Sequence, residues 1–191
     1  MASLILHQII GENFCKSNNI NSQQELLKGN IAPDISPNKE ASHFKAPRPF
    51  IKYIDAIEKR VDLSSYCKNN KICTDYDLGY FLHLVTDYIF YNRLIINNTK
   101  FEDFCHADYP ASSQKMYKEY ERIAHFVLSV FPQTDVSQLP IYTTVTLDED
   151  LTLFTEIELL NFIDICSNIN LQQLYNDISN NDYSTLNNIK F

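Results

Sequence analysis

The chain of 191 residues contains only three glycines, Gly11, Gly29 and Gly79, and no tryptophan. Because the tight turns of all-β proteins depend on glycine, so few of them leave little material for a fold of many short strands. Long hydrophobic runs are absent as well, since no window approaches the ~18 apolar residues that a membrane-spanning helix needs. We therefore expect an all-α protein with no membrane span.

Positive charge is also scarce, with 16 Lys and Arg against 24 Asp and Glu and a formal net charge of −8. A nucleic-acid groove or an anchor for anionic membranes that depends on bulk positive charge is therefore not expected. The N-terminal stretch MASLILHQII has no basic residues before its apolar run and no small-residue cleavage site after it, so it does not match a secretion signal. These features predict a cytoplasmic protein.

Several chemical signatures are missing. The sequence has no Walker A motif, no GxGxxG and no GxSxG, which excludes phosphoryl transfer by a P-loop. The number of cysteines is odd, and none of them shows the CxxC spacing of a zinc knuckle or redox pair, so we expect reduced thiols. The cysteines are Cys15, Cys67, Cys73, Cys105 and Cys166.

The length predicts a single domain over residues 1–191, a multi-helix bundle with a candidate-site half at 1–97 and C-terminal helices at 112–180. Four prolines from Gly29 to Pro49 predict a long loop there, and loops of that length usually either have a function or are disordered. The tail after about Asn180 should fray. Apolar periodicity predicts helices at 2–14, 22–27 (capped by Gly29), 50–61, 74–96, 112–130, about 148–167 and 171–180, with a turn at 108–111 and one β-like run at 142–147.

The most informative helix, 74–96, carries His83 and Asp87 one turn apart, so both side chains point the same way. Asp87 lies within the apolar segment FLHLVTDYIFY, where an unpaired buried carboxylate would be unfavourable. A hydrogen bond from His83, a salt bridge to Arg93, or a cation shared with His83 would each neutralise it.

Three further residues favour the cation. Asp34 and His43 lie in the predicted loop, and His7 lies on the apolar face of the first helix, where a lone histidine is more often an ordinary core residue. Three imidazoles and two carboxylates suit one or two zinc ions, with manganese and iron as weaker rivals. Asp87 could bridge two cations ~3.5–4 Å apart. A buried polar network without metal is the alternative.

Four motifs in order resemble those of the zinc-dependent phospholipase C and S1/P1 nuclease superfamily, in its short bacterial phospholipase C-like branch. They are LHQII, GNIAPDI, SHF and GYFLHLVTDYIF. The resemblance spans roughly Leu4 to Phe90. It implies a mainly helical fold with metals in a cleft between helices and loops. It also implies that His83, Asp87, Asp34 and His43 correspond to one metal sphere, while His7 and Asp87 serve its neighbour.

The chain departs from that family downstream. The family places another histidine and a His-x-x-x-Glu pair after the HxxxD helix, whereas this chain has Arg93 and, further on, only His106, Glu121 and His125 as possible replacements. The family's secreted enzymes also use the free amine of the processed first residue as a ligand. One or two metal ions are therefore expected rather than three.

The function expected from the ligand set is a metal-dependent phosphoester hydrolase, a phosphodiesterase or phospholipase C-like enzyme acting on a small phosphoester or a lipid headgroup. Asp34 is the candidate for orienting or deprotonating the attacking water. Lys45, Arg48 and Arg93 are candidates for orienting a phosphate. The alternative is a catalytically reduced, metal-binding structural or interaction module of the same fold. The sequence does not indicate the oligomeric state.

Overall fold

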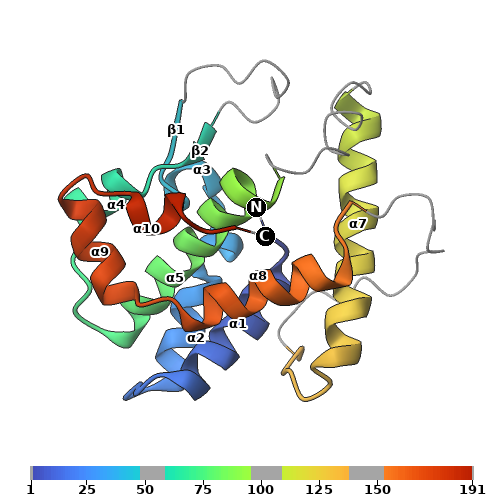
Figure 1. Ribbon diagram of the computed structural model, residues 1–191, viewed down its shortest axis with the longest axis horizontal. Coiled ribbons are helices and arrows are strands. Elements are labelled where there is room, and N and C mark those ends of the chain that lie inside the picture. Colours follow the sequence, from blue (N-terminus) through green and yellow to red (C-terminus); the bar gives the residue numbers. More distant parts are fainter. Residues whose placement is uncertain (1, 48–58, 96–108, 138–152, 191) are drawn as a thin grey trace.

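The computed structural model describes residues 2–47, 59–95, 109–137 and 153–190, with backbone only at 46–47, 59–60, 95 and 109–116. The described chain is mainly helical, as expected, with one pair of three-residue strands (Figure 1). The elements are α1 (Leu4–Ser17), α2 (Gln23–Ile35), α3 (Lys39–Ser42), β1 (Lys45–Pro47), β2 (Lys59–Val61), α4 (Leu63–Asn69), α5 (Asp75–Ile89), the π-helix η2 (Phe90–Ile95), α7 (Tyr109–Val130), α8 (Glu156–Asn168), α9 (Leu171–Ser179) and α10 (Ser184–Asn187).

Helix α5 passes through the middle of the molecule, with α1 and α2 behind it and α8 and α9 in front in the view of Figure 1. Its first turn is fixed by a capping box, in which Thr74 and Asp77 satisfy each other's backbone N–H groups. From Phe81 to Phe90 every residue is buried, so this helix is enclosed on all sides. The predicted helix 74–96 is confirmed, although its hydrogen bonding changes to the π-helical pattern at Phe90.

The backbones of α2 and α5 touch where two glycines cross. A β-carbon added to Gly79 would lie 2.0 Å from the carbonyl oxygen of Leu26, and one added to Gly29 would lie 2.0 Å from the carbonyl oxygen of Tyr76. Only glycine permits so close an approach. The prediction that Gly29 caps a short helix at 22–27 is therefore wrong, because α2 continues through the crossing to Ile35.

The predicted long loop between Gly29 and Pro49 is wrong for the same reason. Pro33 lies two residues from the end of α2, so the single intrahelical N–H that it lacks belongs to the last turn and the helix continues through it. α3 and β1 follow at once, so Asp34 lies on a helix and His43 ends one. β2 pairs antiparallel with β1, which contradicts the end of the helix predicted at 50–61. Residues 50–58 lie outside the described part.

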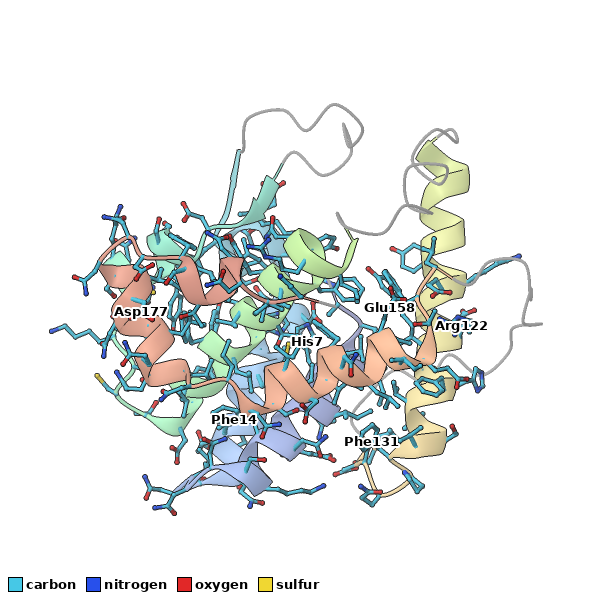
Figure 2. The ribbon with its side chains drawn as sticks, in the orientation of Figure 1. His7, Phe14, Arg122, Phe131, Glu158 and Asp177 are labelled. Atoms are coloured by element: carbon cyan, nitrogen blue, oxygen red, sulfur yellow. The ribbon has the colours of Figure 1, made fainter. Side chains whose placement is uncertain are left out.

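The C-terminal helices were predicted, but α8 begins at Glu156 and not at about residue 148, since Thr155 caps it and residues 153–155 are not helical. α8 and α9 end within one residue of the expected positions, and α7 begins at Tyr109, inside the expected turn at 108–111. The β-like run at 142–147 lies outside the described residues. Arg122, which Figure 2 labels on α7, donates a hydrogen bond of 2.6 Å to the carbonyl of Phe154, just before α8, and so ties these two helices together.

The expectation that the tail frays is wrong. Leu186 on α10 is fully buried, and Arg93 donates to the Leu186 carbonyl at 2.9 Å and to Asn187 Oδ1 at 2.6 Å. Within the described ranges no helix is long and apolar enough to cross a membrane. Cys15, Cys67, Cys73 and Cys166 are free thiols, as predicted, and Cys105 lies outside these ranges.

Candidate metal centre

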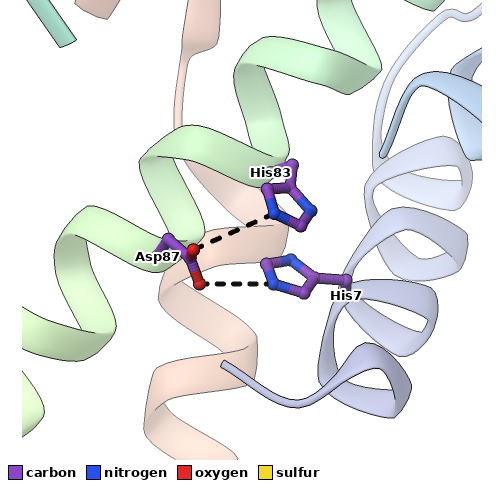
Figure 3. A group of neighbouring side chains, drawn as sticks. All are labelled: His7, His83 and Asp87. Carbon is purple, nitrogen blue, oxygen red and sulfur yellow. Dashed lines mark ion pairs between the residues drawn. The ribbon is translucent and has the colours of Figure 1, made fainter. Parts of the chain in front are cut away.

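The structure brings all five predicted ligand residues into one cluster, although four separate segments carry them. His7 comes from α1, Asp34 from the last turn of α2, His43 from the end of α3, and His83 and Asp87 from successive turns of α5. Figure 3 shows His7 facing the HxxxD pair from the neighbouring helix. Two groups within the cluster, His7–His83–Asp87 and Asp34–His43–His83, have ligand atoms close enough to share a cation.

The cluster lies in the interior of the molecule, and Figure 2 shows His7 among the central helices. His7, His43, His83 and Asp87 have fully buried side chains, whereas the side chain of Asp34 is 9% exposed. Asp34 is therefore the only member of the cluster that solvent reaches. Buried side chains of this polarity require compensation by hydrogen bonds or by opposite charge.

Two of the three histidines have their tautomers fixed by backbone carbonyls. His83 Nδ1 lies 2.7 Å from the carbonyl oxygen of Asn30, and His43 Nδ1 lies 2.8 Å from that of Lys39. A carbonyl oxygen can only accept, so each Nδ1 carries the hydrogen and each neutral ring presents a bare lone pair at Nε2. These two Nε2 atoms face each other at 3.1 Å. Two lone pairs at that separation repel unless a proton or a metal ion lies between them.

The distances around this pair are close to those within a tetrahedral metal site. Ligand atoms at ~2.0–2.2 Å from a zinc ion, for example, lie about 3.3–3.6 Å from one another. His43 Nε2 lies 3.4 Å from Asp34 Oδ1 and 3.7 Å from Asp87 Oδ2, and His83 Nε2 lies 3.9 Å from the same Asp87 oxygen. We call Asp34, His43, His83 and Asp87 the inner group.

His7 stands beside the inner group and faces the other oxygen of each carboxylate. Its Nε2 lies 3.4 Å from Asp87 Oδ1 and 4.0 Å from Asp34 Oδ2, and its ring stacks on His83 with centroids 3.7 Å apart. The backbone N–H of Ala2 also donates to Asp87 Oδ1, at 2.6 Å. Both carboxylates thus present their two oxygens to different histidines, which is the arrangement of a carboxylate that bridges two cations.

A metal-free polar network fits these distances less well. Hydrogen bonds between nitrogen and oxygen span about 2.7–3.2 Å, and every histidine–carboxylate separation in the cluster is longer. Among the described residues, both ring nitrogens of His7, Asp34 Oδ1 and Asp87 Oδ2 are buried without a hydrogen-bond partner. Such orphaned atoms are unfavourable, and bound cations would satisfy the two carboxylate oxygens and His7 Nε2. Arg93 does not neutralise Asp87, because its guanidinium is bonded to α10.

The electrostatics of the cluster favour a neutral ring at His83 and ionised carboxylates at Asp34 and Asp87. Burial, followed by the neighbouring His7, lowers the pKa of His83 to about 3. Burial alone would raise the pKa of Asp34, but the facing rings of His43, His7 and His83 more than offset it and lower that pKa. The pKa of Asp87 is likewise lowered, against its burial, by the positive charge of the N-terminal amine and by the neighbouring His7 and His83. Bare imidazoles and ionised carboxylates are the forms that bind metals.

Some predicted residues lie elsewhere. His106 and Arg48 fall outside the described residues, and Glu121 and His125 are not members of either metal-capable group, with His125 exposed on α7. Arg93 contacts α10, so the prediction that it orients a phosphate is not supported. No contact places Lys45 at the cluster.

Sequence reasoning missed the residues that support the ligands. The hydroxyl of Tyr80 donates to the Ser42 carbonyl and ties the end of α3, next to His43, to α5. The ring of Tyr80 also stacks on that of Tyr66. Asn30 was also missed, although its position in GNIAPDI, four residues before Asp34, could have drawn attention to it. Such supporting contacts hold metal ligands in their binding orientation.

No protein-family model, curated protein or solved structure matches this chain. The assignment of the cluster therefore depends on its geometry and on the motifs that carry it.

Metal-free protein is expected to lose stability on acidification from neutral pH. An ordinary histidine has a pKa of 6.5 and that of buried His83 is about 3, so between these values the unfolded chain binds a proton that the folded chain does not. Stability is therefore full above pH 6.5 and falls by up to about 1.4 kcal/mol per pH unit toward pH 3. Urea unfolding of chelator-treated protein at pH 7.5, 6.0 and 5.0 measures this. In the variant His83→Gln the free energy of unfolding should depend less steeply on pH. Equal slopes in the variant and the wild type would show that His83 is not the group that causes this dependence.

Proposed function

We propose that this chain is a metal-dependent phosphoester hydrolase whose centre holds two divalent cations, with zinc the best match to its ligands. The observation that carries the proposal is the placement of both carboxylates between histidines, with one oxygen of Asp87 toward His7 and the other toward His43 and His83. A pair of cations held in this way stabilises charge on phosphoryl oxygens and lowers the pKa of a water molecule between them.

The number of donor atoms favours an open centre when two ions are present. An imidazole nitrogen has one lone pair and binds one ion, and His83 Nε2 lies nearest to His43. The inner group then supplies four donors to one ion, which leaves His7 and the second oxygens of Asp34 and Asp87 for the other. Three donors and one free position are the arrangement of catalytic rather than structural zinc.

The position of Asp34 supports a catalytic role for it. It is the only cluster residue with an exposed fraction, and its lowered pKa keeps the carboxylate ionised at neutral pH. Water or a substrate phosphate therefore reaches the centre on the side of Asp34. An ionised carboxylate there can orient the attacking water or accept its proton.

The second candidate is a structural metal module, which the burial of the cluster favours. Four of its five side chains are fully buried, and the inner group alone can saturate a single tetrahedral ion. Structural zinc sites are closed in this way and stabilise the fold directly. In this case the ion joins the end of α3 to α2 and α5, and no phosphoester is hydrolysed.

Metal content and turnover measured on the same sample distinguish the two candidates. Protein is stripped with chelator, reloaded with Zn²⁺ or Mn²⁺, and assayed on bis(4-nitrophenyl) phosphate and 4-nitrophenyl phosphate from pH 5 to 9. We expect two ions per chain and turnover that Asp34→Asn lowers about 10²–10⁴-fold. Saturation at one ion without turnover would establish the structural candidate. Absence of stoichiometric metal would contradict both candidates.

A further inference from the structure

We propose that Asn30 is the positioning residue of the metal centre, which fixes His83 and His7 relative to each other through two separate hydrogen bonds. The proposal deepens the proposed function and rests on it, because it explains how two histidines from different helices are held at one cation site. Asn30 is fully buried on α2, and its side-chain nitrogen bonds to the backbone of α1.

The first bond uses the backbone of Asn30. Its carbonyl oxygen accepts the Nδ1 hydrogen of His83 at 2.7 Å. Asn30 lies next to Gly29 at the close crossing of α2 and α5, so this carbonyl reaches the ring of His83 because the two backbones touch. The bond sets the tautomer of His83, and the Nε2 lone pair is therefore directed at His43 and Asp87.

The second bond uses the side chain. Asn30 Nδ2 donates to the backbone carbonyl of His7 on α1, which fixes the helix turn that carries the His7 ring. The close approach requires Gly11, since a β-carbon there would lie 2.7 Å from the same Nδ2 atom. With α1 and α5 both tied to Asn30, the rings of His7 and His83 stack at 3.7 Å and both face Asp87.

One residue thus sets the separation of two ligands that no direct bond joins. His7 has no hydrogen-bond partner of its own among the described residues, so its orientation depends on the position of its backbone. His43, by contrast, is fixed by Lys39 and Ser42 within its own short segment. Loss of the Asn30 side chain should therefore release His7 from its position beside His83, whereas the backbone carbonyl that orients His83 and the contacts of His43 remain in place.

Cobalt binding tests the proposal, because the visible absorption of Co²⁺ reports the geometry of its ligands. Asn30→Ala and the isosteric Asn30→Asp, which replaces the donor by an acceptor, are compared with wild-type protein in chelator-competition titrations. We expect Co²⁺ affinity to fall about 10–100-fold in both variants, with an altered absorption band. The control is Leu174→Ala, a buried residue of α9 far along the chain from the cluster. It should lower the melting temperature and leave the cobalt affinity and spectrum unchanged.

A second measurement needs no metal. In ¹⁵N-labelled, metal-free wild-type protein, His43 and His83 should both show the Nδ1–H tautomer. In both Asn30 variants these two tautomers should remain, because the backbone carbonyl of Asn30 is still present, whereas the ring signals of His7 should change as its stacking on His83 is disturbed. Wild-type cobalt affinity together with unchanged ring signals of His7 in both variants would overturn the role of Asn30. A wild-type protein that binds no metal would refute the proposed function alone, and the ring signals of His7 in the metal-free variants would still decide the role of Asn30.

Discussion

Replacement of Asp87 by alanine is expected to yield a protein that retains no stoichiometric zinc and that zinc no longer stabilises against heat. Asp87 faces all three histidines, with His7 at 3.4 Å, His43 at 3.7 Å and His83 at 3.9 Å. Its loss removes one member of the inner group and also the carboxylate oxygen that faces His7. Zinc at 1,000 times its dissociation constant stabilises a folded protein by about 4.1 kcal/mol, and the variant should lose all of that gain.

The isosteric variant Asp87→Asn separates the charge of Asp87 from its volume. The amide keeps one oxygen but loses the negative charge, so we expect zinc to be lost as well. The control is Asp164→Ala, which removes a carboxylate from the exposed face of α8 and should leave zinc content and zinc-dependent stabilisation unchanged. Elemental analysis after gel filtration and melting curves with and without zinc provide the measurements. Full zinc content in both Asp87→Ala and His83→Ala would show that these side chains are not metal ligands.

The sequence was sufficient to find Asp87 because its chemistry is local. A carboxylate amid apolar helical neighbours requires a partner, and the i, i+4 spacing places His83 on the same side of α5. The start of α5 could be predicted for the same reason, since its cap, Thr74, and the Asp77 of its first turn lie only three residues apart in the sequence. Such features depend on neighbours in the sequence and can be predicted from it.

The position of Asp34 was harder to predict because the usual signals of a loop were misleading. Gly29 suggested a helix end and Pro33 a break, yet both lie inside α2. The glycine is needed for contact with α5 and not for a turn, and periodicity cannot show which helix will cross another. The prediction that Asp34 belongs to the cluster agrees with the structure, whereas the prediction that a loop carries it is wrong, because it lies on α2.

The supporting contacts were beyond sequence reasoning for a different reason. His83 is oriented by the carbonyl of Asn30 and His43 by the carbonyl of Lys39, and every residue has such a carbonyl. No pattern of side chains in the sequence shows which backbone carbonyls will orient a histidine. The burial of the cluster was likewise not predicted, because a cleft between helices and loops was expected, whereas only Asp34 reaches solvent. These properties arise from the tertiary packing of α1, α2 and α5.

Replacement of Gly79 by alanine should destabilise the protein strongly, although local preferences predict the opposite. In a helix interior alanine is favoured over glycine by about 1 kcal/mol, and it also restricts the unfolded chain. Here the new β-carbon would lie 2.0 Å from the Leu26 carbonyl oxygen, whereas a carbon–oxygen contact needs about 3.3 Å. The obstacle is backbone, so α2 must move away from α5. We expect a net loss near the upper end of the range of about 1–3 kcal/mol typical of overpacked cores.

The same displacement should weaken metal binding. The carbonyl of Asn30 lies one residue beyond Gly29 on α2, and a shift of about an ångström would stretch its 2.7 Å bond to His83 past hydrogen-bond range. Gly29→Ala should behave in the same way, because its β-carbon would meet the backbone of Tyr76. Gly11→Ala is the graded comparison: its β-carbon would meet side-chain atoms of Asn30 and Leu27, which can shift, so its loss of stability should be smaller. Urea unfolding and zinc titration of the three variants measure both effects, and a Gly79→Ala protein more stable than wild type would show that α2 and α5 do not cross in contact.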